Sequence, residues 1–155
     1  MTGRHKSRHR AVQILYQCDI RPLAPEHALA AFYDSLYSEE NKERPDRDEF
    51  MEELVAGALR QRSEIDALIE AQSANWRIER MPAVDRNILR LAVYELRQRD
   101  LAAPIVIDEA LELTRRFSGE DSVSFVNGVL DGVWKLLADT RRRCDSGYRR
   151  QWWLQ

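Results

Sequence analysis

The chain has 155 residues and a formal net charge of −2. Its length predicts one domain, and a domain of this size buries roughly 68–70% of the surface that its unfolded chain exposes, so it needs no metal or disulfide to fold. Hydrophobic residues make up 44% of the sequence, close to the globular average, which argues against wholesale disorder.

The charge is unevenly distributed along the chain. Residues 1–10 contain four cations and no acid, a charge of +4, and residues 141–155 contain five arginines and one aspartate, also +4. The 130 residues between them therefore hold −10. An acidic body with a basic segment at each end indicates contact with a polyanion at the ends and leaves an acidic surface for something else.

Several classes of protein are excluded at this stage. The sequence contains no run of 18 apolar residues, so we expect no membrane span. No apolar region follows the basic N-terminus, so we expect no secretory signal. Cys18 and Cys144 lie far apart and outside any CxxC motif, which predicts two reduced thiols in a cytoplasmic protein.

Helical periodicity runs through most of the chain, and strand-like alternation is almost absent. In chain order, the expected helices are 7–20, 25–37, one capped by Asp46 or Asp48, one beginning at the Ser63-x-x-Asp66 capping box, one opened by Met81-Pro82, one from Pro104 to Phe117, and one led by Glu120 or Asp121. The fourth is alternatively a kinked continuation of the third. The fifth is apolar nearly all round, which is typical of a buried central helix.

These patterns predict an all-α protein, a compact bundle of about seven helices. We expect a helical domain over residues 1–140, followed by a basic, Trp-containing tail over 141–155 that is mobile.

The sequence contains no recognisable catalytic constellation. The motifs GxGxxG, GxxxxGK[ST], HExxH and GxSxG are missing. His5 and His9 have the i, i+4 spacing of helical metal ligands, but four cations surround them and would repel a metal ion. Glu109 and Glu112 share a helix face, as solvated carboxylates commonly do. We therefore expect no enzyme, no metal site and no cofactor.

The basic start, RHKSRHR at residues 4–10, runs directly into the first predicted helix, and Tyr16 follows His9 at i+7 on the same side. Cationic grooves with aromatic faces bind single-stranded RNA. A solvated basic tail is the alternative on composition alone.

Three blocks of sequence carry a family resemblance. They are SRHRAVQILY at 7–16, PAVDRNILRLAVYEL at 82–96 continuing to DEALEL at 108–113, and FSGEDS at 117–122 with FVNGVLD at 125–131. In this order and spacing, they resemble the NusB family of transcription antitermination factors over roughly residues 5–137.

The resemblance implies an all-helical fold without catalysis. It implies binding of single-stranded boxA RNA in ribosomal-RNA leader transcripts together with NusE, a small-subunit ribosomal protein. The heterodimer would then join the elongating RNA polymerase complex and suppress termination. Some family members self-associate instead, so a homodimer is an alternative.

Carried over position by position, the resemblance also implies a set of RNA-binding residues. These are Arg4, Lys6, Arg8, Arg10, Tyr16, Asp85, Asp121, Ser124, Phe125 and Asn127. Four phosphate contacts from the basic start would lower log K with log salt at a slope near −3, on the order of 0.7 for each contact with a single strand. Phe125 is alternatively a core residue, and Asp121 alternatively a helix cap.

One departure and two rival functions accompany the resemblance. The family often has an acidic residue where this chain has Arg8-His9-Arg10, which makes the segment more cationic and, through His9, sensitive to pH near about 6.5.

A protein-only helical scaffold without specific RNA binding is one rival. A ribosomal-RNA methyltransferase with a NusB-like domain is the other, but the Gly-rich loop of its methyl-donor site is missing from the sequence.

Overall fold

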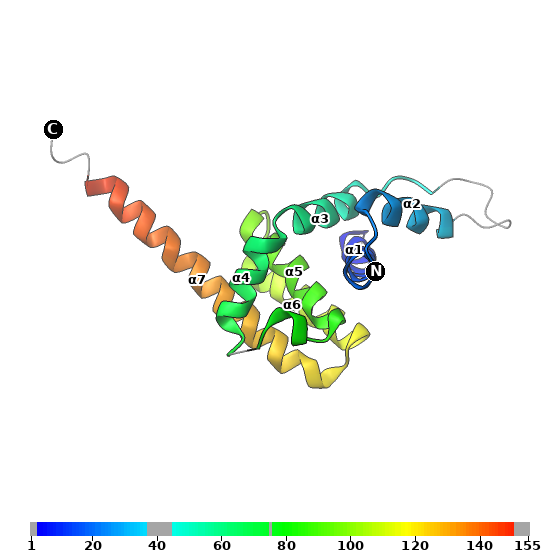
Figure 1. The fold of residues 1–155 in the computed structure, drawn as a ribbon. Coiled ribbons are helices and arrows are strands. Elements are labelled where there is room, and N and C mark those ends of the chain that lie inside the picture. The colour runs from blue at the N-terminus through cyan, green and yellow to red at the C-terminus, as the bar shows by residue number, and fades with distance from the viewer. Residues whose placement is uncertain (1–2, 37–44, 75, 151–155) are drawn as a thin grey trace.

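The computed structural model describes residues 3–36, 45–74 and 76–150, with the backbone alone for 145–150. The helices are α1 Gly3–Ile20, α2 Pro25–Leu36, α3 Glu49–Arg60, α4 Arg62–Gln72, α5 Ala83–Gln98, α6 Ala103–Phe117 and α7 Val123–Arg150, with short 3-10 turns η1 Ile78–Arg80 and η2 Glu120–Ser122 (Figure 1). These described ranges contain no strand, and the prediction of an all-α fold with about seven helices is confirmed.

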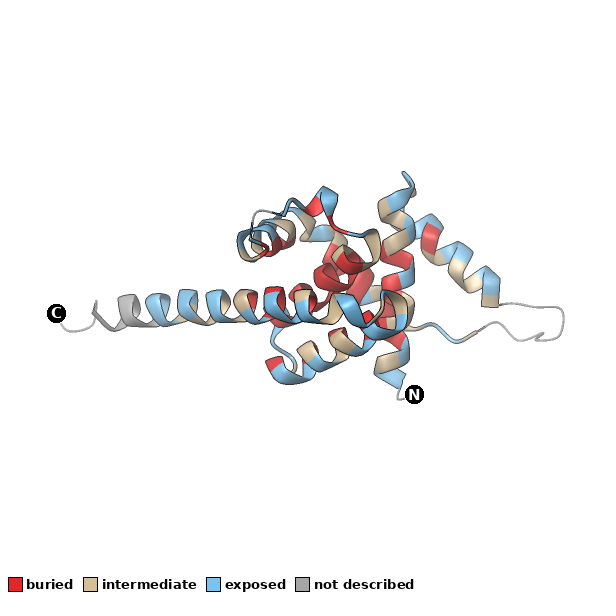
Figure 2. Cartoon of the chain, turned by 90° about the horizontal axis from the view of Figure 1, so that it is seen from below, coloured by how far each residue is buried: buried red, intermediate tan, exposed pale blue. Residues whose placement is uncertain are grey.

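Helix α5 forms the centre of the bundle. It packs against α1, α3, α4, α6 and α7, and all but one of its residues from Asp85 to Leu96 are buried. Figure 2 shows this concentration of buried residues at the middle of the molecule. A helix buried on all sides needs apolar residues around most of its circumference, which is why the sequence pattern identified it.

The ends of the helices follow local chemistry. Asp48 caps α3 by accepting a hydrogen bond from the Met51 backbone N–H at 3.0 Å, as expected. Ser63, by contrast, lies inside α4, whose first residue follows Gln61 without a side-chain cap. Gly119 has a φ of +110°, a conformation that favours glycine, and it separates α6 from η2.

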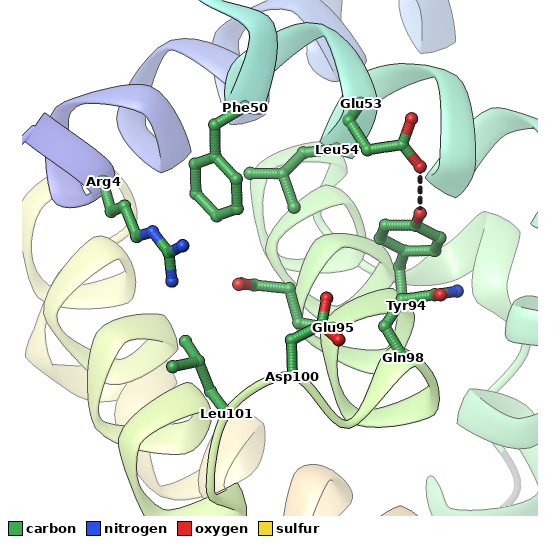
Figure 3. A pocket seen from close by; sticks show the side chains of 9 residues that line it. All are labelled: Arg4, Phe50, Glu53, Leu54, Tyr94, Glu95, Gln98, Asp100 and Leu101. Carbon is green, nitrogen blue, oxygen red and sulfur yellow. Dashed lines mark hydrogen bonds between the residues drawn. The ribbon is translucent and has the colours of Figure 1, made fainter.

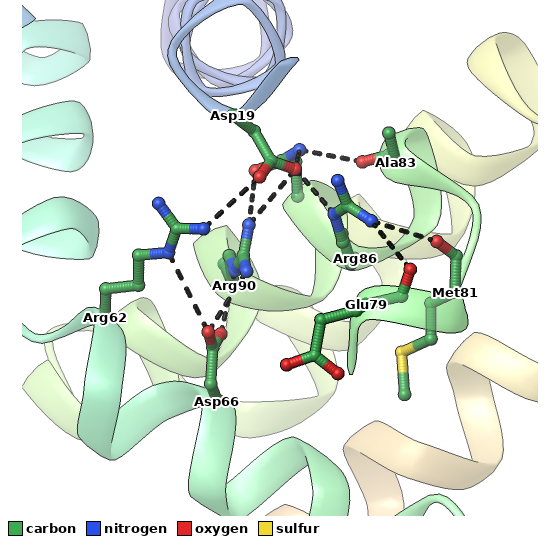
Figure 4. Close-up of polar contacts among 9 residues, drawn as sticks. Asp19, Arg62, Asp66, Glu79, Met81, Ala83, Arg86 and Arg90 are labelled. Atoms are coloured by element: carbon green, nitrogen blue, oxygen red, sulfur yellow. Dashed lines mark hydrogen bonds and ion pairs between the residues drawn. The ribbon is translucent and has the colours of Figure 1, made fainter. Parts of the chain in front are cut away.

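A buried ionic network holds α1 against α4 and α5 (Figure 4). The Asp19 carboxylate accepts a hydrogen bond from Asn87 at 2.9 Å and lies 3.3 Å from Arg62 and from Arg90. Arg90 also binds Asp66 through two hydrogen bonds, at 2.8 and 3.0 Å. Burial alone would raise the pKa of Asp19, but hydrogen bonds from Arg86 and Asn87 and the nearby guanidinium charges lower it overall.

The last helix is longer than expected. The sequence predicted that the helix would give way to a tail near Asp139, but α7 continues to Arg150 and projects from the bundle (Figure 1). Trp152 and Trp153 lie outside the described residues, and the mobility of segment 141–155 stays a prediction. No helix in the described ranges is long and apolar enough to cross a membrane.

Candidate nucleic-acid interface

The four cations of the basic start all lie on α1, but in different surroundings. Arg4 and Lys6 are exposed, Arg10 is half-buried, and Arg8 is only 3% exposed. Because a helix turns by about 100° per residue, alternate positions of this segment face different neighbours. The segment is therefore not one continuous cationic surface.

Arg8 is turned into the bundle and forms an ion pair with Glu95 of α5. Its Nε and Nη2 donate three hydrogen bonds to the Glu95 carboxylate at 2.8–3.1 Å, and Nη1 lies 3.6 Å from Glu109. Burial alone would lower the pKa of Arg8, but the hydrogen bonds and charge of Glu95 raise it overall. The expectation that Arg8 contacts RNA phosphates does not fit this geometry, since its donors are directed at a buried carboxylate.

Arg10 is held at the surface by a second acidic residue. Its Nη1 donates to Asp48 at 3.1 Å, and its guanidinium carbon lies 5.6 Å from the centre of the Phe32 ring. Ser7 also donates to Asp48 at 2.8 Å. The N-cap of α3 thus also fixes the position of Arg10, which retains partial exposure.

Arg4 lies beside a hollow between α3 and α5. Figure 3 shows its side chain at the rim of a hollow of about 180 Å³ between α3 and α5. Its guanidinium carbon lies 5.1 Å from the Phe50 ring centre. On the far side, Tyr94 donates to Glu53 at 2.7 Å, and burial together with that hydrogen bond raises the pKa of Tyr94 to about 12.

Tyr16 lines an open groove of about 700 Å³ between α1 and α2. Two further aromatic rings, Phe32 and Phe117, lie in its walls, and Gln13 and Gln17 contribute amide groups from the same face of α1. Lys6 precedes Gln13 by seven residues, and hence lies in the same row along α1. This groove combines aromatic faces, hydrogen-bonding groups and a nearby exposed cation.

His9 connects the basic start to the groove. Its ring lies 4.4 Å from the ring of Phe117, centre to centre. Burial and the charges of Arg116 and His5 lower the pKa of His9 below its usual value of 6.5. The expectation of titration near 6.5 is therefore corrected downward.

Asp85 is buried rather than presented at the surface. It is 2% exposed and accepts a hydrogen bond from Ser118, whose hydroxyl oxygen lies 3.0 Å from the Ser122 hydroxyl and can accept its proton. The carboxylate therefore joins the start of α5 to the turn before α7, so a direct RNA contact does not fit its position. Asp121, within η2, is exposed.

Ser124 and Phe125 line a separate hollow of about 270 Å³ at the start of α7. Phe125 is half-buried and packs against the core, in agreement with the core alternative, and its contact with RNA stays a prediction. Trp76, in the same hollow, is 55% exposed. Sequence reasoning missed Trp76 as a candidate site residue. Asn127 is exposed on the first turns of α7 and does not line this hollow.

The arrangement of these residues is suited to binding. Within the described ranges, no group of three or more His, Cys, Asp or Glu side chains is placed to hold a metal ion. Cys18 and Cys144 are both free thiols. The Tyr16 groove offers aromatic rings on which the bases of a single-stranded nucleic acid can stack and polar groups with which they can form hydrogen bonds.

Comparison with known proteins gives a consistent assignment. The NusB family matches residues 5–135. The transcription antitermination protein NusB of Solibacter usitatus (strain Ellin6076) is 53% identical over 139 residues, covering 90% of this chain and 93% of that protein.

Solved structures agree with the sequence match. T. maritima NusB superposes with a TM-score of 0.72 at 34% identity, covering 85% of this chain and 90% of that one. A chain from the crystal structure of antitermination factors NusB and NusE in complex with dsRNA gives a TM-score of 0.75 at 31% identity. The match covers 88% of this chain and 98% of that one. The relatives are named as antitermination factors rather than enzymes, in agreement with the sequence. The chain belongs to the NusB family.

Proposed function

We propose that this protein is a transcription antitermination factor that binds single-stranded boxA RNA of ribosomal-RNA leader transcripts together with NusE, and that the heterodimer joins the elongating RNA polymerase complex. Family membership supports the general role. The similar structure that holds NusB, NusE and dsRNA supports binding of RNA and NusE. Single-stranded boxA and RNA polymerase as partners come from the sequence resemblance.

The Tyr16 groove is the observation that carries the RNA-binding proposal. Tyr16, Phe32 and Phe117 offer three rings in one open groove, and stacking of a base on an aromatic ring contributes about 1–3 kcal/mol. Lys6 and Arg10 are the cations on this side of α1. Two phosphate contacts give a salt slope of about −1.4, half of what four contacts would give.

The acidic remainder of the chain supports NusE as the second partner. The residues between the two basic ends carry −10. Ribosomal proteins that contact RNA are typically basic, and opposite charge speeds such an encounter more than it increases the affinity.

A binding titration tests the proposal. Labelled boxA RNA and a scrambled RNA of equal length are titrated with the wild-type protein, with and without NusE, and with Tyr16→Ala and Tyr16→Phe variants. We expect preference for boxA, tighter binding with NusE, loss of affinity in Tyr16→Ala and retention in Tyr16→Phe, which keeps the ring. Equal binding of both RNAs, or none, would instead favour the protein-only scaffold.

A further inference from the structure

The distal part of α7 forms a basic arm outside the bundle. The arm comprises α7 from residue 135 to 150, and it extends beyond residue 135, where the family match ends. Figures 1 and 2 show it projecting from the body with mostly exposed residues in its described part. Among the α7 residues whose burial the structure describes, Val133 is the last buried one, and within the arm Leu137 still packs partly buried against the core.

Two cations of the arm, Lys135 and Arg142, are available to a ligand. Lys135 and Arg142 have side chains 72% and 80% exposed, and each pairs with an exposed acid one turn earlier, Asp131 at 2.7 Å and Asp139 at 3.3 Å. Ion pairs this exposed contribute little stability, so phosphate groups can replace the acids as partners at low cost. Arg141 stacks over Trp134, with 5.5 Å between its guanidinium carbon and the ring centre.

Helical register connects the arm to the hollow at the start of α7. Gly128, Lys135 and Arg142 are spaced seven residues apart, so they lie in one row along the helix. Gly128 borders the hollow that contains Trp76 and Phe125. From Gly128 to Arg142 the row covers about 21 Å at 1.5 Å per residue.

We infer that the arm is a second RNA-contacting element, which binds the phosphate backbone of nucleotides that flank boxA and continues from the hollow of Trp76 and Phe125 along Lys135 and Arg142. The inference rests on the proposed function, because it takes RNA as the ligand. It adds a surface that begins inside the family match, at the hollow of Trp76 and Phe125, and continues along the arm past residue 135, where that match ends.

Two properties of the arm favour RNA over a protein partner: its positive charge, and the small amount of exposed apolar surface in its described part. Residues 141–155 carry +4, which suits a polyanion. In the described part of the arm, Leu136 is the only exposed large hydrophobic residue, at 37%. A stable protein interface buries at least about 1,200 Å² around an apolar centre, and this face does not provide one.

Probes of two lengths test the inference with the full-length protein. One RNA is boxA alone, of about 10 nucleotides, within the range of a single binding surface. The others carry the same boxA extended by about 15 nucleotides on the 5′ or the 3′ side, enough to reach along the arm. The variant is Lys135→Gln with Arg142→Gln. The matched control is Arg47→Gln with Arg60→Gln, whose side chains are 72% and 61% exposed and also pair with acids.

We expect the arm variant to bind short boxA like the wild type but to lose affinity for one extended RNA, with a salt slope smaller by about 1.4. Between about 50 and 200 mM salt, the wild type should then lose about sevenfold more affinity for that RNA than the arm variant does. The control, with the same change in net charge, should keep the wild-type slope. Circular dichroism checks that both variants are folded.

Three outcomes would overturn the inference: equal losses on short and extended RNA, no loss on any RNA, or the same loss in the control. A wild-type dimer in sedimentation that the arm variant abolishes, with RNA binding unchanged, would identify the arm as a protein interface instead. Failure of the proposed function is distinguishable. It would appear as equal binding of boxA and scrambled short RNA by the wild type, while the comparison of the variants on extended RNA still decides the role of the arm.

Discussion

Replacing Arg8 with alanine should destabilise the fold rather than simply weaken RNA binding. The Arg8 side chain is 4% exposed and that of Glu95 is 10% exposed, and three hydrogen bonds join them. Arg8→Ala leaves the Glu95 carboxylate buried without its cation. Breaking a buried ion pair by removing one partner costs about 3–5 kcal/mol, a large part of the roughly 5–15 kcal/mol that stabilises a typical domain.

Urea unfolding and thermal melting followed by circular dichroism measure this loss. At about 2–4 °C per kcal/mol for a chain of this size, Tm should fall by roughly 6–20 °C. Lys6→Ala is the matched control, because Lys6 is an exposed cation on the same helix. Its free energy of unfolding should stay within about 0.5 kcal/mol of wild type, while its affinity for RNA falls.

A double variant separates the loss of the ion pair from a general effect of mutation. Arg8→Met combined with Glu95→Leu removes both charges, and an apolar pair in place of a buried ion pair is often neutral or stabilising. The double variant should therefore recover most of the stability lost in Arg8→Ala. A loss below about 1 kcal/mol in Arg8→Ala, the value of an exposed ion pair, would refute the reasoning and return Arg8 to the RNA-contacting surface.

Three further predictions concern the groove, the ionic network and the core. Tyr16→Ala should weaken boxA binding by about 1–3 kcal/mol in fluorescence titrations, and an unchanged affinity would count against the groove. The pKa of Asp19 is lowered in the fold, so its contribution is complete above the ordinary aspartate pKa and is lost as pH falls through the lowered value. Asp19→Asn should consequently flatten the acid side of the stability profile measured by urea unfolding, and an unchanged profile would contradict this. In Gly57→Ala, the added Cβ would meet the buried Tyr94 ring at 2.1 Å, so thermal melts should show a loss of about 1–3 kcal/mol. A wild-type Tm would mean that the ring can move aside.

Most of the helical architecture could be predicted because it follows from local patterns. The apolar circumference of α5 identified the centre of the bundle, and Asp48 was one of two expected caps for α3. The capping box at Ser63 was wrong, since α4 begins directly after α3 and leaves no room for a separate N-cap there. Capping rules based on local sequence failed here because Gln61 is both the last cap of α3 and the first cap of α4.

The site was harder to predict because its residues acquire their roles from distant partners. Arg8 meets Glu95 across 87 positions of sequence, and Asp85 meets Ser118 across 33. No spacing rule in a single sequence reveals such pairs. Trp76 carried one usable signal, a large aromatic residue at a break between helical patterns, and its exposure became visible only in the fold.

The chain has two basic ends, although its net charge is only −2. In the fold, the cations of these two ends have different kinds of partners. At the N-terminal end, Glu95 neutralises Arg8 and Asp48 holds Arg10, so much of that +4 stabilises the bundle. Lys135 and Arg142 of the arm, by contrast, pair with acids that are themselves exposed. Exposed charges respond to added salt, whereas buried pairs are screened much less. On extended RNA, Lys135 and Arg142 of the arm should therefore add a salt slope of about −1.4, as large as the one expected from Lys6 and Arg10 of α1.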